Sequence, residues 1–341
     1  MKVLISFEPN YKNDNFEGMR LRKTIKNALE VNGIKYATNI GDDFQIAHFI
    51  SPNVDNQVLN EINEKHIPVV VSALYCEDDV NASFIESVYH HGNVHIKLKP
   101  KAYKILNLAD LILVPTPSAK KILLESGIDK RIEVVKPGIN MARFDFSRDD
   151  EKELFYRYFN EDPQKKLVIG LGDSHSSNDI KAFINAAKHN KDVNFYYVGY
   201  DLKTNHVPLK VKLIVKQAPK NVKFVKVMPE DIYRSALMNA SIFVGINNIT
   251  IGAMSLIDAM AAKNQIIIKK PLINSELVND GINGYSAIFS ETLTSLIDKY
   301  FIGKLKETTE YAYRQMCENN LKIFGEKLIN YYQELINKKE D

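Results

Sequence analysis

The stretch Pro68-Val69-Val70-Val71-Ser72 decides the fold of this 341-residue chain. It is β-branched and almost wholly apolar, which is typical of a strand whose two faces are both covered by helices, so it predicts a parallel sheet. Leu111-Ile112-Leu113-Val114 repeats the pattern further along the chain. Around these two strands the apolar spacing changes to that of helices, at 21–31, 58–65 and 119–126. The first part of the chain therefore predicts strands and helices that alternate around a buried parallel sheet.

The same alternation restarts after a charged, proline-containing stretch at 145–164. Its strands are expected at 167–170, 193–198, 222–225, 241–244 and 265–268, with helices at 180–188, 230–239 and 253–262. Two successive series predict an α/β protein with two doubly wound, Rossmann-like domains that face each other across a cleft. We place the domains at 1–150 and 151–320, and expect a C-terminal helix at 321–341 to pack back towards the first domain.

Composition excludes several other classes of protein. The chain has 45 Lys+Arg against 42 Asp+Glu, a net charge of +3, and 45% hydrophobic residues, which argues against disorder. No apolar run approaches the roughly 20 residues of a membrane span, and the start is too short and polar for a signal peptide. Two cysteines, Cys76 and Cys317, predict neither a disulfide framework nor a metal cluster. The near-neutral charge argues against a highly basic nucleic-acid binder.

Two segments that follow strands are candidates for chemistry. Val135-Lys136-Pro137-Gly138-Ile139-Asn140, with Phe144 beyond it, turns the chain sharply and on physical grounds alone is an ordinary turn. Leu167 to Ser174 contains Gly170 and Gly172 before a helix, where small residues let backbone N–H groups approach a phosphate. Because this is only a G-x-G, a plain tight connection remains the alternative.

A second pair of segments lies nearer the C-terminus. Asp258 stands in the apolar stretch 250–262, and charged residues are almost never fully buried without a partner. It therefore faces the cleft, pairs with a buried base, or lies on an exposed helix stripe. Further on, Asp280-Gly281 and Asn283-Gly284 predict a compact polar turn before a strand.

Taken in this order, the segments resemble glycosyltransferase family 4, whose members have the GT-B fold. That family has a Pro-Asn-Gly-Ile-Asp-type turn followed by a Phe, a helix that reads Glu-Ala-Met-Ala, and then Glu-Leu/Ile-Val, Asp-Gly and Asn-Gly. The counterparts here are Lys136-Pro137-Gly138-Ile139-Asn140 with Phe144, Asp258-Ala259-Met260-Ala261, Glu276-Leu277-Val278, Asp280-Gly281 and Asn283-Gly284. The resemblance spans essentially the whole chain.

The first domain is most similar to small bacterial diglucosyl-diacylglycerol synthases, which add a second hexose to a monoglycosyl-diacylglycerol. The stretches that resemble them are Gly33 to Asn39, Glu77-Asp78-Asp79 and Thr116-Pro117-Ser118. The resemblance implies a retaining transfer of glucose from UDP-glucose to a monoglucosyl-diacylglycerol, at the cytoplasmic face of the cell membrane. It implies no required cofactor, although stimulation by Mg²⁺ stays open.

The resemblance also assigns site residues. Asp258 would accept hydrogen bonds from the donor ribose, and Glu77, Asp78 or Asp79 would face the acceptor. Catalytic roles are expected at Glu77, Thr250 and Asp258, and the donor-binding residues at Gly170, Gly172, Gly252, Asp258 and Glu276.

Four family positions are occupied differently in this sequence. A glutamate falls at Thr250, an arginine at Leu171, a lysine near Asn178, and a histidine around 72–74, where there is none. Because the two cations neutralise the leaving diphosphate in the family, their loss leaves open a non-catalytic partner subunit. Candidate substitutes by position are His175, Lys181, Lys216, Lys269 and Lys270.

A basic stretch in the first domain predicts contact with anionic membrane lipids. Between 90 and 137, nine Lys+Arg oppose four acids, so this stretch carries +5. Bases and aromatic residues interleave there, as an interfacial segment requires, and the expected membrane or acceptor contacts are Tyr89, His90, His91, Lys97, Lys99, Lys101, Tyr103 and Lys104. A solvated charged face is the alternative reading of the residues alone. No nucleic-acid-binding module is recognisable, and a soluble or polysaccharide acceptor remains the rival to a lipid.

Overall fold

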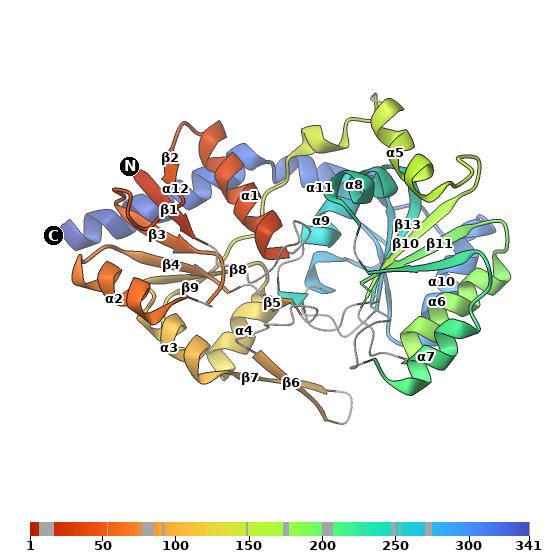
Figure 1. Ribbon diagram of the computed structural model, residues 1–341, viewed down its shortest axis with the longest axis horizontal. Helices are drawn as coiled ribbons and strands as arrows, with labels where there is room; N and C mark the ends of the chain where they lie inside the picture. Colours follow the sequence, from red (N-terminus) through yellow and green to blue (C-terminus); the bar gives the residue numbers. More distant parts are fainter. Residues whose placement is uncertain are drawn as a thin grey trace. The chain divides into compact units, whose positions relative to one another are not determined.

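The computed structural model describes residues 1–6, 17–52, 54–73, 75–76, 85–90, 93–147, 149–172, 177–199, 207–226, 228–246, 250–251, 254–269 and 275–340. The described chain divides into two compact units. Unit 1 comprises 1–140, 249–254 and 318–341, and unit 2 comprises 141–248 and 255–317. Figure 1 labels their helices and strands.

Unit 1 is built on a six-stranded parallel sheet, as the buried valine run predicts. The strand order is β2-β1-β3-β4-β8-β9, and every neighbouring pair is parallel. Every residue of β3, β4 and β8 is buried, which is why these strands lack a polar face. The strands span β1 Lys2–Ser6, β2 Lys35–Ala37, β3 Ile46–Phe49, β4 Val69–Ser72, β8 Leu111–Val114 and β9 Ile132–Val134.

The helices of unit 1 begin and end where local chemistry predicts. The Asp55 side chain accepts a hydrogen bond from the Gln57 amide at the start of α2, and Thr116 accepts one from the Ala119 amide at the start of α4. Gly33 and Gly127 follow α1 and α4 at positive φ, the backbone conformation that glycine tolerates best. The helices span α1 Glu17–Val31, α2 Asn56–Glu64, α3 Pro100–Leu108 and α4 Pro117–Glu125.

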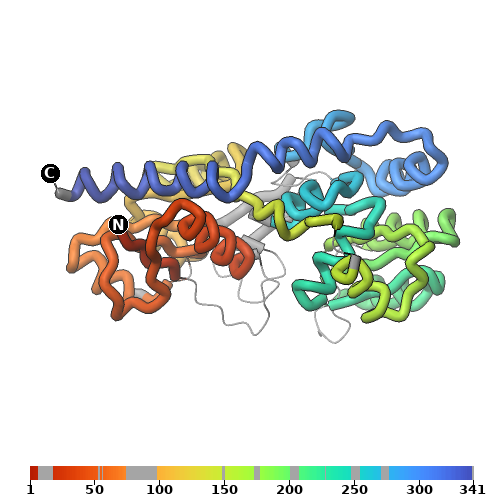
Figure 2. The backbone as a smooth tube through the Cα atoms, turned by 90° about the horizontal axis from the view of Figure 1, so that it is seen from above, coloured from red at the N-terminus to blue at the C-terminus, as the bar shows by residue number. Residues whose placement is uncertain are grey.

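The last helix, α12 (Leu321–Glu340), belongs to unit 1 although it lies at the end of the chain. It packs against α1, where the backbones come so close that a Cβ on Gly325 would lie 2.6 Å from the Ala28 carbonyl oxygen (Figure 2). Ion pairs tie its far end to the sheet, from Arg131 to Glu334 at 2.7 Å and from Lys339 to Asp110 at 3.2 Å.

The basic stretch begins with elements that the sequence patterns did not predict. Residues 89–104 divide between an antiparallel hairpin and a helix. The hairpin joins β6 (Ile85–His90) to β7 (Asn93–Leu98), and α3 follows directly, with Pro100 in its first turn. Along β7, Val94, Ile96 and Leu98 alternate with polar residues, which is a strand pattern that the sequence reasoning did not use.

Unit 2 carries a second six-stranded parallel sheet, in the order β12-β11-β10-β13-β15-β16. This is the order of a Rossmann sheet, in which the connection reverses direction between β10 and β13. The expected α/β fold with two doubly wound sheets is therefore confirmed. The strands span β10 Leu167–Leu171, β11 Asn194–Val198, β12 Val222–Val225, β13 Ala240–Gly245, β15 Gln265–Lys269 and β16 Tyr285–Ala287.

Helices cover both faces of the second sheet (Figure 1). One side has an aromatic core in which Phe183 stacks edge-on against Phe195 and Tyr197. The charged stretch 145–164 contains a helix, α5, which packs on α8 and buries Phe155. The helices span η1 Met141–Phe144, α5 Asp149–Phe159, α6 Ser177–His189, α7 Leu209–Lys216, α8 Glu230–Asn239, α9 Met254–Ala261, η2 Ser275–Leu277, α10 Ser290–Phe301 and α11 Thr309–Glu318.

Within the part of the chain that is described, no helix combines the length and the apolar character that crossing a bilayer requires.

Candidate functional site

The edge formed by the carboxyl ends of the strands is where open parallel sheets bind ligands, above all where the strand order reverses. In unit 1 the strand order reverses between β1 and β3, and in unit 2 between β10 and β13. Each unit carries polar side chains at or near this edge, and the two sets differ in charge.

In unit 2, Asp258 lies in the interior of α9 and is 1% exposed. Its Oδ1 lies 3.7 Å from Nη1 of Arg143, and Nη2 of Arg143 donates a hydrogen bond to Oε1 of Glu230 at 3.0 Å. The structure thus excludes the exposed helix stripe and shows that Asp258 pairs with a base. The three side chains form a cluster of one guanidinium and two carboxylates, which we call the Arg143 cluster.

Arg143 is the functional candidate that the sequence reasoning missed. It stands on η1, between Asn140 and Phe144, inside the turn motif already singled out. Phe144 is buried, and the Arg143 guanidinium lies 5.7 Å from the centre of its ring. It was not among the candidate cations, because its contacts come from a distant part of the chain. The only signal in the sequence was a base within a family motif.

Gly170 lies in β10 and Gly172 directly follows it, and the packing of the core accounts for both glycines. A Cβ on Gly170 would overlap the Phe183 ring, and a Cβ on Gly172 would overlap the side chain of Tyr197. The packing of the core therefore requires glycine at both positions, independently of any ligand. Their role in donor binding stays a prediction.

A separate ion pair lies at the carboxyl end of β15. Lys269 is 3.1 Å from Oδ1 of the buried Asp179, which also accepts a hydrogen bond from Ser290. Beside it is a pocket of about 550 Å³, lined by α6, α10 and the residues before α10. Of the proposed substitutes for the missing cations, Lys269 is thus paired, Lys181 and Lys216 are exposed, and His175 and Lys270 lie outside the described residues.

The Asp-Gly and Asn-Gly segment is a structural turn before β16, as predicted. Asn283 is fully buried and donates to the Leu277 carbonyl, while Asp280 accepts from the Ser286 amide. Gly281 has a φ of +71°, which favours glycine there. Glu276 is exposed on η2, just before this turn, and its donor contact remains a prediction.

A short antiparallel ladder contains one of the expected catalytic positions, Thr250. β14 (Thr250–Ile251) pairs with β5 (Tyr75–Cys76), and Thr250 lies opposite Cys76. Cys76 directly precedes Glu77 in the sequence. Glu77 itself, Asp78, Asp79 and Gly252 lie outside the described residues.

The expected membrane contacts divide between the hairpin and α3. Tyr89 and His90 are in β6 and Lys97 is in β7, whereas His91 lies outside the described residues. Lys99 precedes α3, whose exposed residues include Lys101, Tyr103 and Lys104. The Tyr103 hydroxyl donates to the Gly127 carbonyl at 3.2 Å.

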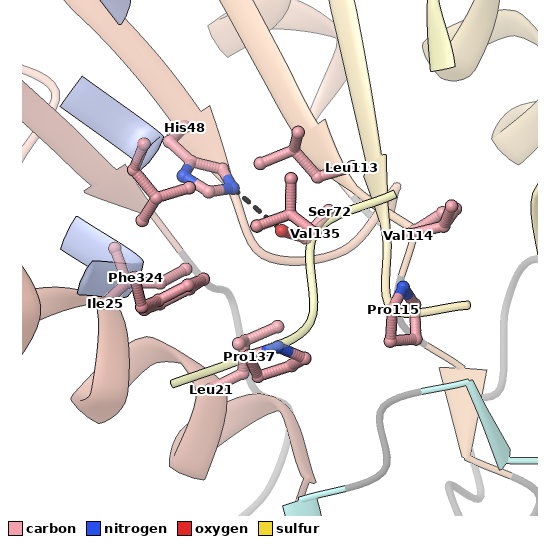
Figure 3. A pocket seen from close by; sticks show the side chains of 12 residues that line it. Leu21, Ile25, His48, Ser72, Leu113, Val114, Pro115, Val135, Pro137 and Phe324 are labelled. Carbon is pink, nitrogen blue, oxygen red and sulfur yellow. Dashed lines mark hydrogen bonds between the residues drawn. The ribbon is translucent and has the colours of Figure 1, made fainter. Parts of the chain in front are cut away.

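In unit 1, a small apolar pocket lies beside the carboxyl ends of β4 and β8 (Figure 3). His48, on β3, is buried and is one of the residues that line the pocket, with Nδ1 2.6 Å from the Tyr332 hydroxyl and Nε2 2.8 Å from Oγ of Ser72. Burial lowers the pKa of His48 to about 3, so its ring is neutral at physiological pH. The histidine expected at 72–74 is absent from the sequence, but an imidazole from the neighbouring strand lies against Ser72.

Among the described residues, no three His, Cys, Asp or Glu side chains gather in a way that would hold a metal ion.

Comparisons with known proteins agree with this architecture. No protein-family model matches the chain. It is 25% identical over 325 residues to a processive diacylglycerol alpha-glucosyltransferase from Acholeplasma laidlawii, covering 91% of each chain. It is similar in fold to a glycosyltransferase from Rickettsia africae, with a TM-score of 0.66 and 15% identity over 98% of each chain. HepE from Anabaena, crystallised with UDP and glucose, gives a TM-score of 0.68 at 14% identity, over 98% of this chain and all of that one.

The two six-stranded sheets and these likenesses show that the chain has the GT-B fold, which it shares with these glycosyltransferases. The similarity over nearly the whole length to the Acholeplasma enzyme confirms, more narrowly, the resemblance to the family 4 enzymes that glucosylate diacylglycerol lipids.

Proposed function

We propose that this chain transfers glucose from UDP-glucose to a monoglucosyl-diacylglycerol, with retention, to form a diglucosyl lipid at the membrane surface. The observation that carries the proposal is the likeness to the diacylglycerol alpha-glucosyltransferase along 91% of both chains. The glucose of UDP-glucose is α-linked, so an enzyme that forms an α-glucoside from it retains the anomeric configuration. The word processive in that relative's name agrees with an acceptor that already carries a sugar.

The Arg143 cluster supports a nucleotide-sugar donor in unit 2. A carboxylate accepts hydrogen bonds only, so Asp258 suits the paired hydroxyls of a ribose. Arg143 lies beside it and is 17% exposed on its side chain, which leaves part of the guanidinium accessible. In a site of low dielectric, such a cation stabilises the negative charge that develops on a leaving diphosphate. We therefore assign to Arg143 the neutralisation of the leaving diphosphate. In the family an arginine and a lysine have this role, at positions that Leu171 and Asn178 occupy here.

The exposed bases of unit 1 support a lipid acceptor. Lys101 and Lys104 stand on the exposed side of α3, and Lys99 precedes that helix. Each base close to an anionic surface contributes roughly 1 kcal/mol, so a few together suffice for reversible docking. The proposal therefore places the enzyme on the cytoplasmic face of the membrane as a peripheral protein, without a required metal.

The decisive experiment is incubation of the full chain with labelled UDP-glucose and a mixture of acceptors in anionic vesicles. The acceptors are diacylglycerol, monoglucosyl-diacylglycerol and a soluble glucan, and EDTA is added to half of the samples. We expect label in a diglucosyl lipid with and without EDTA, and an α configuration of the new linkage by NMR. Label in the glucan alone contradicts the lipid acceptor, and transfer that EDTA abolishes contradicts the metal-free reaction.

The donor assignment is tested with Asp258→Asn, which keeps the size of the side chain and removes its charge. We expect UDP affinity, measured by calorimetry, to fall at least tenfold. Asp192→Asn, a change at an exposed turn of unit 2, is the matched control and leaves the affinity unchanged. Wild-type UDP affinity and turnover in Asp258→Asn would refute the assignment, and absence of UDP binding in the unchanged chain would indicate a non-catalytic partner subunit.

A further inference from the structure

Three polar side chains from distant parts of the sequence form a buried chain of hydrogen bonds in unit 1. Tyr332 of α12 contacts His48 of β3, and His48 contacts Ser72 at the end of β4. Tyr332 and His48 are completely buried, and Ser72 is 6% exposed. Such a chain has few ways to satisfy its hydrogens, because the polar atoms of the completely buried Tyr332 and His48 are removed from bulk water.

The direction of these hydrogen bonds follows from the buried hydroxyl of Tyr332. Its hydroxyl has one hydrogen, and among the described residues the atom that accepts it is Nδ1 of His48. The reverse direction would leave the hydrogen of the completely buried Tyr332 hydroxyl without an acceptor, whereas in this direction the remaining hydrogen is that of Ser72, which borders a pocket. Because Nδ1 accepts, the ring hydrogen is on Nε2, and Nε2–H donates to Oγ of Ser72. A neutral ring has one N–H only, so this assignment is complete.

Ser72 is then left with a hydroxyl hydrogen that no described residue accepts. Its side chain lines the apolar pocket, whose walls include Leu113, Val135 and Phe324 (Figure 3). None of the twelve residues that line the pocket carries a formal charge at neutral pH. The structure thus directs one hydrogen-bond donor into an otherwise apolar space.

The volume of the pocket limits what the donor can meet. It is about 30 Å³, whereas one water molecule requires roughly 10–15 Å³ measured in this way. A sugar ring or an acyl chain is too large for it. A single hydroxymethyl group fits, with its carbon against the apolar walls and its oxygen towards Ser72.

We propose that Ser72 binds the acceptor, by donating a hydrogen bond to the oxygen of an uncharged hydroxymethyl arm on the acceptor's sugar, and that His48 and Tyr332 position its hydroxyl. This rests on the proposed function, since it assigns the acceptor to unit 1. It gives α12 a part in acceptor recognition, because this helix supplies the hydroxyl that fixes the histidine tautomer.

The direction of these hydrogen bonds is tested without any measurement of activity. Long-range ¹H–¹⁵N NMR of the histidine rings in the full chain reports which nitrogen of His48 carries the hydrogen. We expect the Nε2–H tautomer in the unchanged protein, and a mixture of tautomers in Tyr332→Phe. An Nδ1–H tautomer in the unchanged protein would overturn the proposal, because Ser72 would then donate to His48.

The binding role is tested by steady-state kinetics with Ser72→Ala. We expect the KM for monoglucosyl-diacylglycerol to rise about tenfold, the effect of one lost hydrogen bond, with the KM for UDP-glucose unchanged. The matched control is Ser126→Ala, which removes a serine hydroxyl that bonds the Ile122 carbonyl at the end of α4. A change of less than twofold in the acceptor KM of Ser72→Ala would overturn the proposal.

A modified acceptor locates the hydrogen bond. An acceptor with 6-deoxyglucose lacks the hydroxyl of the hydroxymethyl arm, so we expect the unchanged enzyme to lose about tenfold in kcat/KM and Ser72→Ala to lose nothing further. Equal losses in both proteins would place the contact elsewhere and overturn the proposal. Failure of the proposed function is distinguishable, because the unchanged chain would then make no labelled glycolipid while the tautomer result would still stand.

Discussion

The two sheets of this protein each have six parallel strands, and they differ in the charge of the side chains near their carboxyl edges. Unit 2 gathers Arg143, Glu230 and Asp258 there, together with the Lys269–Asp179 pair. Unit 1 directs a neutral serine into an apolar pocket and keeps its histidine uncharged by burial. The comparison teaches that one architecture can present either a charged or an uncharged edge, because the residues after the strands are free to vary while the strands are fixed by packing.

The charged edge also has the larger expected effect on stability. Arg143→Gln leaves Asp258 and Glu230 without the guanidinium, and an uncompensated buried charge costs about 3–5 kcal/mol. We expect unit 2 to unfold at clearly lower urea concentration, as measured by hydrogen exchange of β10 and β13. The double variant Arg143→Gln/Asp258→Asn removes the stranded charge and recovers part of the loss. Equal losses in the single and double variants would show that charge is not what the cluster stabilises.

The neutral edge depends on the close approach of α12 to α1. Gly325→Ala places a Cβ 2.6 Å from the Ala28 carbonyl oxygen, and such overpacking costs about 1–3 kcal/mol. We expect limited proteolysis to release α12 faster in this variant. Gly41→Ala is the control, since nothing lies within 4 Å of the added carbon. Equal release rates in the two variants would contradict the tight contact.

The uncharged histidine predicts how unit 1 responds to acid. Burial lowers the pKa of His48 to about 3, whereas the unfolded chain has the ordinary value of 6.5. Above pH 6.5 both states are neutral and pH has no effect through this group; below it the unfolded state takes up the proton, so stability falls by about 1.4 kcal/mol per pH unit down to about pH 3.

Urea unfolding at pH 7 and pH 5 measures this effect, which we expect to be about 2 kcal/mol in the unchanged protein. His48→Gln keeps a polar side chain without a titrating group in this range, and its stability should differ less between the two pH values. The same pH dependence in both proteins would show that His48 is not the group responsible.

The smallest effect is expected at the exposed end of α12. Hydrogen bonds from Arg131 and Lys338 hold the pKa of Glu334 at about 2, so its contribution is present above pH 4.5 and is lost as pH falls towards 2. Since exposed ion pairs contribute little, Glu334→Gln should leave the melting temperature at pH 7 almost unchanged. A large decrease would show that this pair, and not the Gly325 contact, holds α12 in place.

Sequence patterns predicted the sheets well and the connections poorly. The apolar runs at β4, β8 and β10 had to be buried strands, since no other environment suits them. The hairpin β6–β7, helix α3 and helix α10 were not predicted, although β7 alternates polar and apolar residues and α10 has Leu293, Leu296 and Ile297 at helical spacing. Such short patterns do not by themselves distinguish one element from another. The turn at 280–284 was predicted because glycine next to Asp or Asn has a specific backbone preference.

The same distinction between local patterns and distant contacts applies to the site residues. By itself the sequence determined the two strand–helix series, the buried strands and the presence of one carboxylate, Asp258, in an apolar helix. Only the tertiary structure decided that Arg143 neutralises that carboxylate, and that Tyr332 bonds His48 across 284 positions of the chain. The physical reason is that burial leaves a local periodic signal in the sequence, whereas a hydrogen bond or ion pair between two distant side chains leaves none until the chain folds.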